Sequence, residues 1–259
     1  MKNKASDGVV ETIKTLVYAV AIAIVIRTFL YEPFNIPSGS MVPTLLVGDY
    51  LFVSKFSYGY SRYSLPFGLP LISGRLFFHS PRSGDVAVFK YPRDPSVDYI
   101  KRLVGLPGDR IQVIEGVLYI NNVPSKLTRV GSYVDSETGA LRQEYIETLP
   151  DGVQHPILLA SRDYTPPPPR CDNPDEMSRD VENTCPFIVP PDHYFMMGDN
   201  RDNSADSRDP NSGVGYVPAE NLVGHAEFLF FSTNGYARWW QLWNWPFTIR
   251  YDRLFTAIR

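Results

Sequence analysis

The pattern of apolar and polar residues predicts one N-terminal helix followed by many short strands. Residues 15–26 carry no charge, and the apolar run extends over residues 13–30 if Lys14 and Arg27 reach toward the two polar interfaces. A helix of that length is just long enough to span the hydrocarbon core of a bilayer. We therefore expect a transmembrane anchor at residues 13–31.

A cleavable signal peptide has the same charged start and apolar stretch, but it ends in small residues at −3 and −1. Residues 27–33 offer no such pair after the apolar run, so we expect an uncleaved anchor. Because Lys2, Lys4 and Lys14 precede the run, the positive-inside rule places residues 1–12 in the cytoplasm. The rest of the chain is then expected on the outer side.

Short apolar runs bounded by Gly, Asp or Pro follow the anchor and are typical of strands. One run breaks at Glu115-Gly116, as expected for a hairpin. The 23 Pro and 18 Gly interrupt the chain too often for long helices to dominate. We predict a mainly β fold with an antiparallel core. The apolar runs are residues 50–56, 85–91, 99–104, 111–120, 186–190, 194–197 and 227–231.

Two segments differ from the core in composition. Residues 57–83 are rich in Tyr, Phe, Leu and Pro, so we expect a long hairpin packed on the core or lying on lipid. Residues 124–186 are polar, include four prolines at 166–169 and show weak strand periodicity, so we interpret them as an inserted, β-rich subdomain. The core is then residues 32–123 and 187–259.

Composition narrows the possible partners and ligands. A net charge of −3 over 259 residues makes nucleic acid an unexpected partner. The two cysteines, Cys171 and Cys185, lie in the inserted segment, and on the oxidising side of a membrane they are more naturally a disulfide than a metal site. No histidine has metal-ligand spacing, so we interpret each as a surface or structural residue. The histidines are His79, His155, His193 and His225.

All four tryptophans lie near the C-terminus, within residues 238–250, together with two arginines. Such a cluster can close a hydrophobic core, or it can form the aromatic belt of a protein at a membrane interface. The sequence leaves both interpretations open. The tryptophans are Trp239, Trp240, Trp243 and Trp245, and the arginines are Arg238 and Arg250.

Candidate chemistry lies in the segment that begins at Pro37, which six residues separate from the apolar run. Its Ser40 lies on a turn braced by Pro and Gly. A serine hydroxyl is a poor nucleophile until a base takes its proton. No Gly-x-Ser-x-Gly motif surrounds Ser40, and pairing it with any of the histidines would be arbitrary. A lysine in an apolar strand is an alternative base, because burial lowers its pKa.

Lys101 is such a lysine, and it precedes Arg102 on a predicted strand. Alternation places these two cations on opposite faces, so periodicity alone does not decide which one is buried. Arginine does not deprotonate in proteins. Of the two, only Lys101 is therefore a candidate base.

The loop at residues 198–208 has the acidic and amide composition of a calcium site, but its spacing does not fit one. An EF-hand beginning at Asp199 would place Arg201 at the third position and Ser204 where glycine is needed. The alternative is a solvated turn held by its own Asp and Asn side chains. We predict no metal site.

Three motifs occurring together resemble signal peptidase I, the leader peptidase family. They are Ser-Gly-Ser-Met-Val-Pro-Thr at residues 38–44, Tyr-Ile-Lys-Arg-Leu-Val-Gly-Leu-Pro-Gly-Asp at 99–109, and Gly-Asp-Asn-Arg-Asp-Asn-Ser-Ala-Asp-Ser-Arg at 198–208. The match covers residues 34–56, 84–109 and 190–225 in the family's order. Many relatives carry two membrane spans before the serine motif, whereas this chain has room for one.

The resemblance implies that Ser40 attacks the scissile carbonyl while Lys101 accepts its proton. The Ser40 backbone N–H and the Ser38 hydroxyl would then hold the oxyanion. Ser204 would orient the Lys101 ammonium, and Asp206 with Arg208 would brace the loop. The implied substrate pockets are formed by Phe34, Ile36, Leu45, Tyr99 and Ile100.

The implied activity is removal of signal peptides from secretory preproteins by cleavage after small residues, in the pattern Ala-x-Ala. It would take place at the outer face of a bacterial cytoplasmic membrane, in contact with lipid, with no metal or organic cofactor. One alternative is a related Ser/Lys peptidase with a dedicated substrate, such as a conjugation-type processing enzyme. The anchor argues against a soluble self-cleaving repressor. The other alternative is a non-enzymatic anchored β domain that binds envelope partners.

Overall fold

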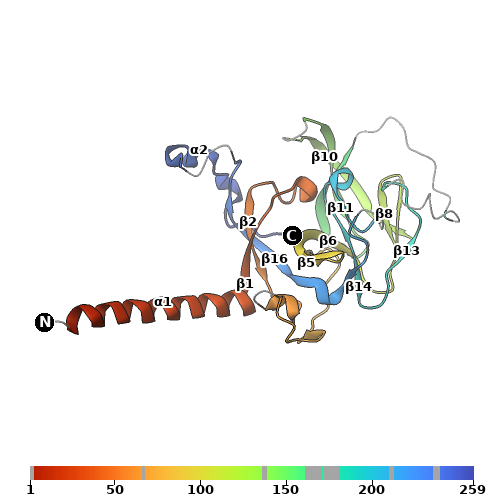
Figure 1. Ribbon diagram of the computed structural model, residues 1–259. Helices are drawn as coiled ribbons and strands as arrows, with labels where there is room; N and C mark the ends of the chain where they lie inside the picture. Colours follow the sequence, from red (N-terminus) through yellow and green to blue (C-terminus); the bar gives the residue numbers. More distant parts are fainter. Residues whose placement is uncertain are drawn as a thin grey trace.

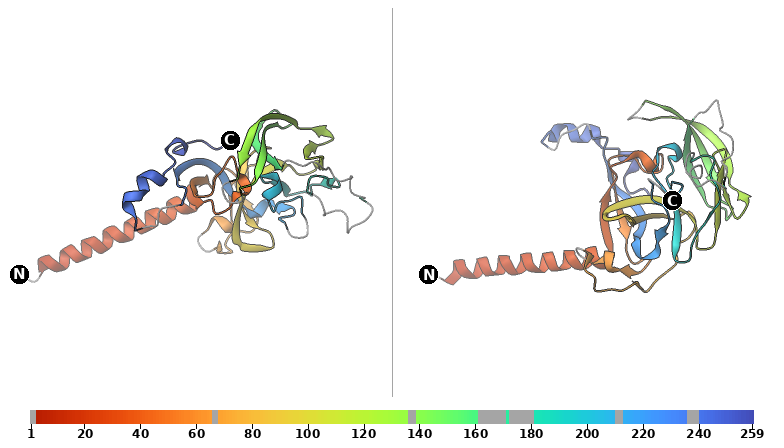
Figure 2. Two further views of the ribbon diagram at one scale, coloured as in Figure 1. Left: turned by 90° about the horizontal axis from the view of Figure 1, so that it is seen from above. Right: turned by 45° about the vertical axis from the view of Figure 1, so that its right-hand side comes forward.

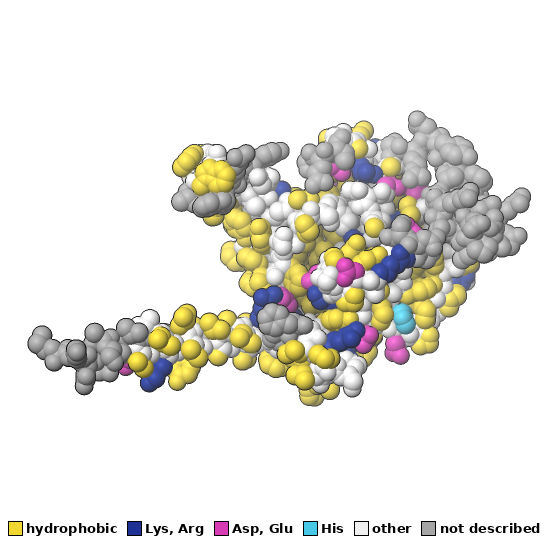
Figure 3. All heavy atoms as spheres, in the orientation of Figure 1, with side chains coloured by type: hydrophobic (Ala, Val, Ile, Leu, Met, Phe, Trp, Pro, Cys, Tyr) yellow, Lys and Arg dark blue, Asp and Glu magenta, His cyan; other side chains and the backbone are white. Residues whose placement is uncertain are grey.

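The computed structural model describes residues 3–65, 68–135, 139–160, 171, 181–209, 213–235 and 240–259. Helix α1 (Asn3–Phe29) projects away from a β-rich body and carries the N-terminus at its far end (Figures 1 and 2). Among the described residues, Val10–Phe29 is the one helical segment long and apolar enough to cross a membrane. Its apolar side chains are exposed along the helix (Figure 3).

The body is built on a seven-stranded sheet in which all neighbouring strands are antiparallel. This confirms the prediction of a mainly β, antiparallel core. In spatial order the strands are β1 (Tyr31–Asn35), β2 (Asp49–Ser54), β16 (Leu222–Ser232), β5 (Val86–Tyr91), β6 (Asp94–Gly105), β14 (His193–Met197) and β15 (Val217–Pro218).

A second sheet contains the hairpin expected at Glu115-Gly116. Both residues have positive φ, 52° and 77°, and they form the two-residue turn that joins β7 to β8. The order in this four-stranded sheet is β13 (Phe187–Ile188), β7 (Arg110–Ile114), β8 (Val117–Ile120) and β9 (Val123–Pro124).

Residues 57–83, of which 66 and 67 lie outside the described part, form little regular structure. Only β3 (Tyr60–Ser61) and β4 (Arg75–Leu76) pair within the segment. The Arg75 guanidinium fastens the segment to the core by donating hydrogen bonds to the carbonyls of Ala219 and Leu222, both at 2.6 Å, and it also donates to the Tyr58 carbonyl within the segment at 3.0 Å. The segment therefore packs on the core, while Leu71 and Phe77 stay exposed.

Within residues 124–186, three antiparallel strands form a separate sheet, which we call the inserted sheet. Its strands are longer than the weak periodicity of the sequence indicated. The periodicity is weak because many side chains of the sheet are only half buried and polar residues occupy both faces. Cys171 and Cys185 form a disulfide with their Cα atoms 5.5 Å apart. The strands are β10 (Lys126–Val134), β11 (Leu141–Thr148) and β12 (Gln154–Ala160).

The described C-terminal residues, 240–259, form short helical turns and two isolated β-bridges to β16 and Thr233. Trp240, Trp243 and Trp245 are 49%, 69% and 41% exposed, so these three tryptophans do not close the core. Arg238 and Trp239 lie outside the described residues. The short helices of the described residues are η1 (Gly39–Met41), η2 (Arg62–Ser64), η4 (Arg201–Asn203), η5 (Ala219–Asn221), η6 (Leu242–Asn244), α2 (Trp245–Thr248) and η7 (Tyr251–Arg253).

Candidate active site

Ser40 lies on the short helix η1, which is anchored from both sides. Met41 and Leu45 are fully buried in the hydrophobic cluster beneath the turn. From above, the Asn200 backbone N–H donates to the Ser40 carbonyl at 3.1 Å, and the Asn200 side chain donates to the Gly39 carbonyl at 3.0 Å. The turn that carries the hydroxyl is therefore clamped by the loop at residues 198–208.

Lys101 reaches this hydroxyl from the middle of β6. Its Nζ donates a hydrogen bond to Ser40 Oγ at 2.5 Å. Lys101 is 3% exposed and Ser40 is 7% exposed, so water has little access to the pair. Two residues that lie far apart in the sequence thus form a hydrogen-bonded pair, which has the geometry of a candidate serine–lysine dyad.

Burial lowers the pKa of Lys101 to about 8 because it removes water from the ammonium form. The Asp206 and Asp199 carboxylates oppose this effect, and the positive charge of Arg208 adds to it. At pH 7 about one-tenth of Lys101 is therefore unprotonated and able to accept a proton, far more than for a lysine with its ordinary pKa.

Arg102, on the opposite face of β6, is also fully buried, so both neighbouring cations are inside the protein. Its guanidinium forms a two-point ion pair with Asp199, with both nitrogen–oxygen distances 2.8 Å. The Thr44 hydroxyl also donates to Asp199 at 2.5 Å. Arg102 thus fixes the loop at residues 198–208, while Lys101 faces the Ser40 hydroxyl.

The loop at residues 198–208 packs closely against the turn that carries Ser40. A Cβ atom at Gly198 would lie 2.6 Å from the Ser40 carbonyl oxygen and 2.2 Å from Ser204 Oγ, so no larger residue fits there. The Ser204 hydroxyl oxygen is buried, and it has no hydrogen-bond partner, Lys101 included, among the described residues. Its expected role in orienting the ammonium stays a prediction.

Asp206 and Arg208 form a buried ion pair at 2.8 Å. Burial alone would raise the pKa of Asp206, but the Arg208 guanidinium outweighs it and lowers that pKa. Asp206 accepts the Gly198 N–H at 3.0 Å, and Arg208 donates to the Arg201 carbonyl at 2.5 Å. The pair therefore joins the two ends of the loop.

Comparison with known proteins identifies the family. Residues 9–231 match the family described as "Signal peptidase, peptidase S26". The chain belongs to this family of signal peptidases. It is accordingly a hydrolase, a serine endopeptidase of the class that cleaves signal peptides.

Curated relatives match along almost the whole chain. Signal peptidase I of Rickettsia typhi (strain ATCC VR-144 / Wilmington) is 42% identical over 275 residues, which cover 98% of this chain and 96% of that protein. Signal peptidase I of Rickettsia conorii (strain ATCC VR-613 / Malish 7) is 42% identical, covering 93% and 90%. A crystal structure of a signal peptidase I from Enterococcus faecalis V583 has 25% identity and a TM-score of 0.29, covering 57% of this chain and 97% of that one.

In this signal peptidase the expected substrate-binding residues fall into two neighbouring groups. Phe34 and Ile100 are half buried and pack on the hydrophobic cluster that contains Ile36 and Leu45. Tyr99 belongs to a different cluster, and its ring centre lies 5.6 Å from Lys101 Nζ. Four of the five therefore lie together, although Leu45 is fully buried.

Two buried residues of the inserted sheet touch the loop at residues 198–208, and the sequence did not predict these contacts. Glu147 on β11 binds the Arg201 guanidinium with both carboxylate oxygens, one of them at 3.2 Å. His155, its cross-strand neighbour on β12, lies 3.1 Å from Glu147 and 4.0 Å from Asp199. The expectation that His155 is a structural residue agrees with this position. The weak pattern of residues 124–186 gave no signal for either contact.

Proposed function

We propose that this chain removes signal peptides from secretory preproteins through an acyl-enzyme formed on Ser40, with Lys101 as the general base. The observation that carries the proposal is the 2.5 Å hydrogen bond from Lys101 Nζ to Ser40 Oγ in a buried setting. Lys101 with its proton removed accepts the hydroxyl proton as Ser40 Oγ attacks the scissile carbonyl. The resulting ammonium then donates that proton to the leaving amine.

Hydrolysis of the acyl-enzyme uses the same base. Once the amine has left, Lys101 is again neutral and takes a proton from water, which attacks the ester carbonyl. The ammonium then returns the proton to Ser40 Oγ as the ester bond breaks. Each proton thus moves between Lys101 and the reacting atoms, and no other titrating side chain is required.

The oxyanion of each tetrahedral intermediate would be held by the Ser40 backbone N–H and the Ser38 hydroxyl. The two hydroxyl oxygens lie 3.5 Å apart, which supports this arrangement. Removing one such donor typically lowers kcat by 10²–10³. We expect Ser38→Ala to lower kcat by about that factor with little change in KM. Steady-state kinetics on one preprotein measure both, and an unchanged kcat would remove Ser38 from the oxyanion site.

The free strand edges beside the dyad support binding of the substrate as an added strand. Strand β1 is the edge of the seven-stranded sheet. In the described part of the chain, β6 pairs with β14 only from Arg102 onward, so its N-terminal half has one open edge. Alternate residues of an extended substrate would point to the apolar floor formed by Phe34, Ile36 and Ile100. This favours small side chains at −1 and −3, as in Ala-x-Ala.

The membrane location rests on α1 and on the charges before it. An exposed apolar helix is unfavourable in water, so we propose that Val10–Phe29 spans the bilayer as a single pass. The lysines at its N-terminal side favour a cytoplasmic N-terminus. The β body would then lie at the outer face, beside the lipid and the emerging preprotein.

The pH dependence of kcat/KM tests the proposed base. Because Lys101 acts without its proton, kcat/KM is expected to rise with pH through an ionisation near 8, the pKa of Lys101. Activity should fall as the pH drops below that value, because Lys101 becomes an ammonium. A pH titration of preprotein cleavage gives the midpoint. An acid limb with a midpoint near 6.5, the ordinary value for histidine, would indicate a different base.

A further inference from the structure

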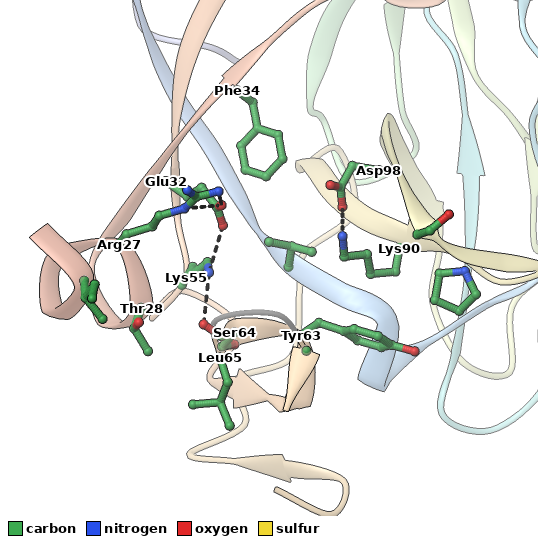
Figure 4. A pocket seen from close by; sticks show the side chains of 15 residues that line it. Arg27, Thr28, Glu32, Phe34, Lys55, Tyr63, Ser64, Leu65, Lys90 and Asp98 are labelled. Carbon is green, nitrogen blue, oxygen red and sulfur yellow. Dashed lines mark hydrogen bonds and ion pairs between the residues drawn. The ribbon is translucent and has the colours of Figure 1, made fainter. Parts of the chain in front are cut away.

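A cavity of about 600 Å³ lies between the end of α1, strand β1 and the hairpin of β5 and β6 (Figure 4). We call it the entry cavity. Its floor includes Phe34 and Val223, which belong to the apolar layer beneath the proposed substrate strand. Its charged walls are formed by Arg27, Glu32, Lys55, Lys90 and Asp98.

The entry cavity is lined by residues of the two strands that lead to Ser40 and Lys101. Asp98 lies on β6 three residues before Lys101, and Phe34 lies on β1 two residues before Ile36. Both strands therefore run from the nucleophile into the cavity. At its other end the cavity is lined by Ile24 and Arg27 of α1, where the apolar helix ends. A preprotein that left the bilayer near the end of α1 and reached Ser40 along these strands would pass through it.

The charges on the cavity walls are paired but unequal in number. Glu32 lies between Arg27 and Lys55, with ion-pair distances of 2.6 and 2.8 Å (Figure 4). Lys90 pairs with Asp98 at 2.9 Å. Three cations thus face two anions, and the wall carries one excess positive charge. A positive charge on a bound peptide would be repelled there, and a negative one attracted.

We propose that the entry cavity is a substrate subsite for residues −4 to −6 of the preprotein, and that it selects against Lys and Arg at those positions. This inference rests on the proposed function. An extended chain advances about 3.3 Å per residue, so a peptide with its scissile bond at Ser40 reaches the level of Asp98 about three to four residues upstream. The cavity is large, so it sets charge preference rather than the small size required at −1 and −3.

Charge reversal of one wall residue tests the proposal. Cleavage is compared for three peptides that share one Ala-x-Ala site and carry Glu, Ala or Lys at −5. Two further sets of three peptides carry the same substitutions at −4 and at −6. For the purified full chain in detergent, we expect kcat/KM to be roughly three- to ten-fold higher with Glu than with Lys. The Lys90→Glu variant should reverse that order. Raising the salt concentration should shrink both differences, because the cavity is open to solvent.

The matched control is Lys126→Glu, the same charge change at an exposed position on the inserted sheet. It should leave the Glu-to-Lys ratio of the wild type unchanged. A ratio that Lys90→Glu leaves unchanged at all three positions would overturn the proposal. If Lys90→Glu instead changes cleavage only when anionic lipid vesicles are added, the cavity binds lipid headgroups, and the proposal is also overturned.

These outcomes differ from a failure of the proposed function itself. If that function is wrong, the wild-type protein does not cleave even the Ala peptide, or the Ser40→Ala variant still cleaves it. If only the subsite is wrong, the Ala peptide is cleaved in a Ser40-dependent way and the charge preference does not respond to Lys90. The Ala peptide therefore serves as the reference in every measurement.

Discussion

Replacing Ser40 by alanine is expected to abolish preprotein cleavage, and replacing Lys101 by methionine is expected to do the same. Nucleophile and base act as a unit, so the loss from either change should be about as large as the loss from both. Purified variants are compared on one preprotein by following the mature product over time. The thermal transition of Ser40→Ala should stay close to that of the wild type, because only one hydroxyl oxygen is removed.

Two further variants separate the chemistry from general damage. Lys101→Arg keeps a positive charge on β6 but cannot accept a proton at these pH values, so it should be as inactive as Lys101→Met. Ser132→Ala, on an exposed position of β10, is the matched serine control and should retain full activity. Substantial cleavage by Lys101→Arg would refute the role of Lys101 as the general base.

The sequence predicted the pairing of Ser40 with Lys101 through chemistry rather than through pattern. Lys101 and Arg102 are neighbours in one apolar strand, and alternation does not distinguish them. What distinguishes them is that lysine can lose its proton whereas arginine cannot, and this difference is independent of the fold. The sequence did not indicate that both cations are buried. Arg102 is stabilised there by Asp199, a partner that only the folded sheet brings close.

The inserted sheet shows where sequence patterns stop being informative. Strand prediction relies on a clear difference between a buried and an exposed face. On β11 most side chains are half buried, and the one that is fully buried is a charged residue, Glu147. A glutamate in a polar strand gives no sign of burial. Its burial depends on Arg201, which comes from a loop after the inserted segment.

Glu147→Gln is expected to destabilise the protein by about 3–5 kcal/mol, because it leaves the Arg201 guanidinium buried without its counter-charge. Burial alone would raise the pKa of Glu147, but the Arg201 charge and His155 lower it to about 2. The carboxylate thus contributes stability above its unfolded pKa of about 4.3, and this contribution is lost as the pH falls toward 2. Urea unfolding of the variant and the wild type in detergent at pH 7 measures the difference.

A matched control and a double variant decide whether the ion pair is responsible. Glu144→Gln makes the same chemical change three residues away on β11, at a half-buried position, and should cost less than about 0.5 kcal/mol. If the loss comes from an unpaired Arg201, then Glu147→Gln combined with Arg201→Gln should cost less than the two single changes added together. Additive costs, or a Glu147→Gln variant as stable as the Glu144→Gln control, would show that the inserted sheet does not hold the catalytic loop through this pair. A double variant that costs less than the two single changes added together would show that it does. The loop that clamps Ser40 through Asn200 is then fixed by a charge on a separate sheet.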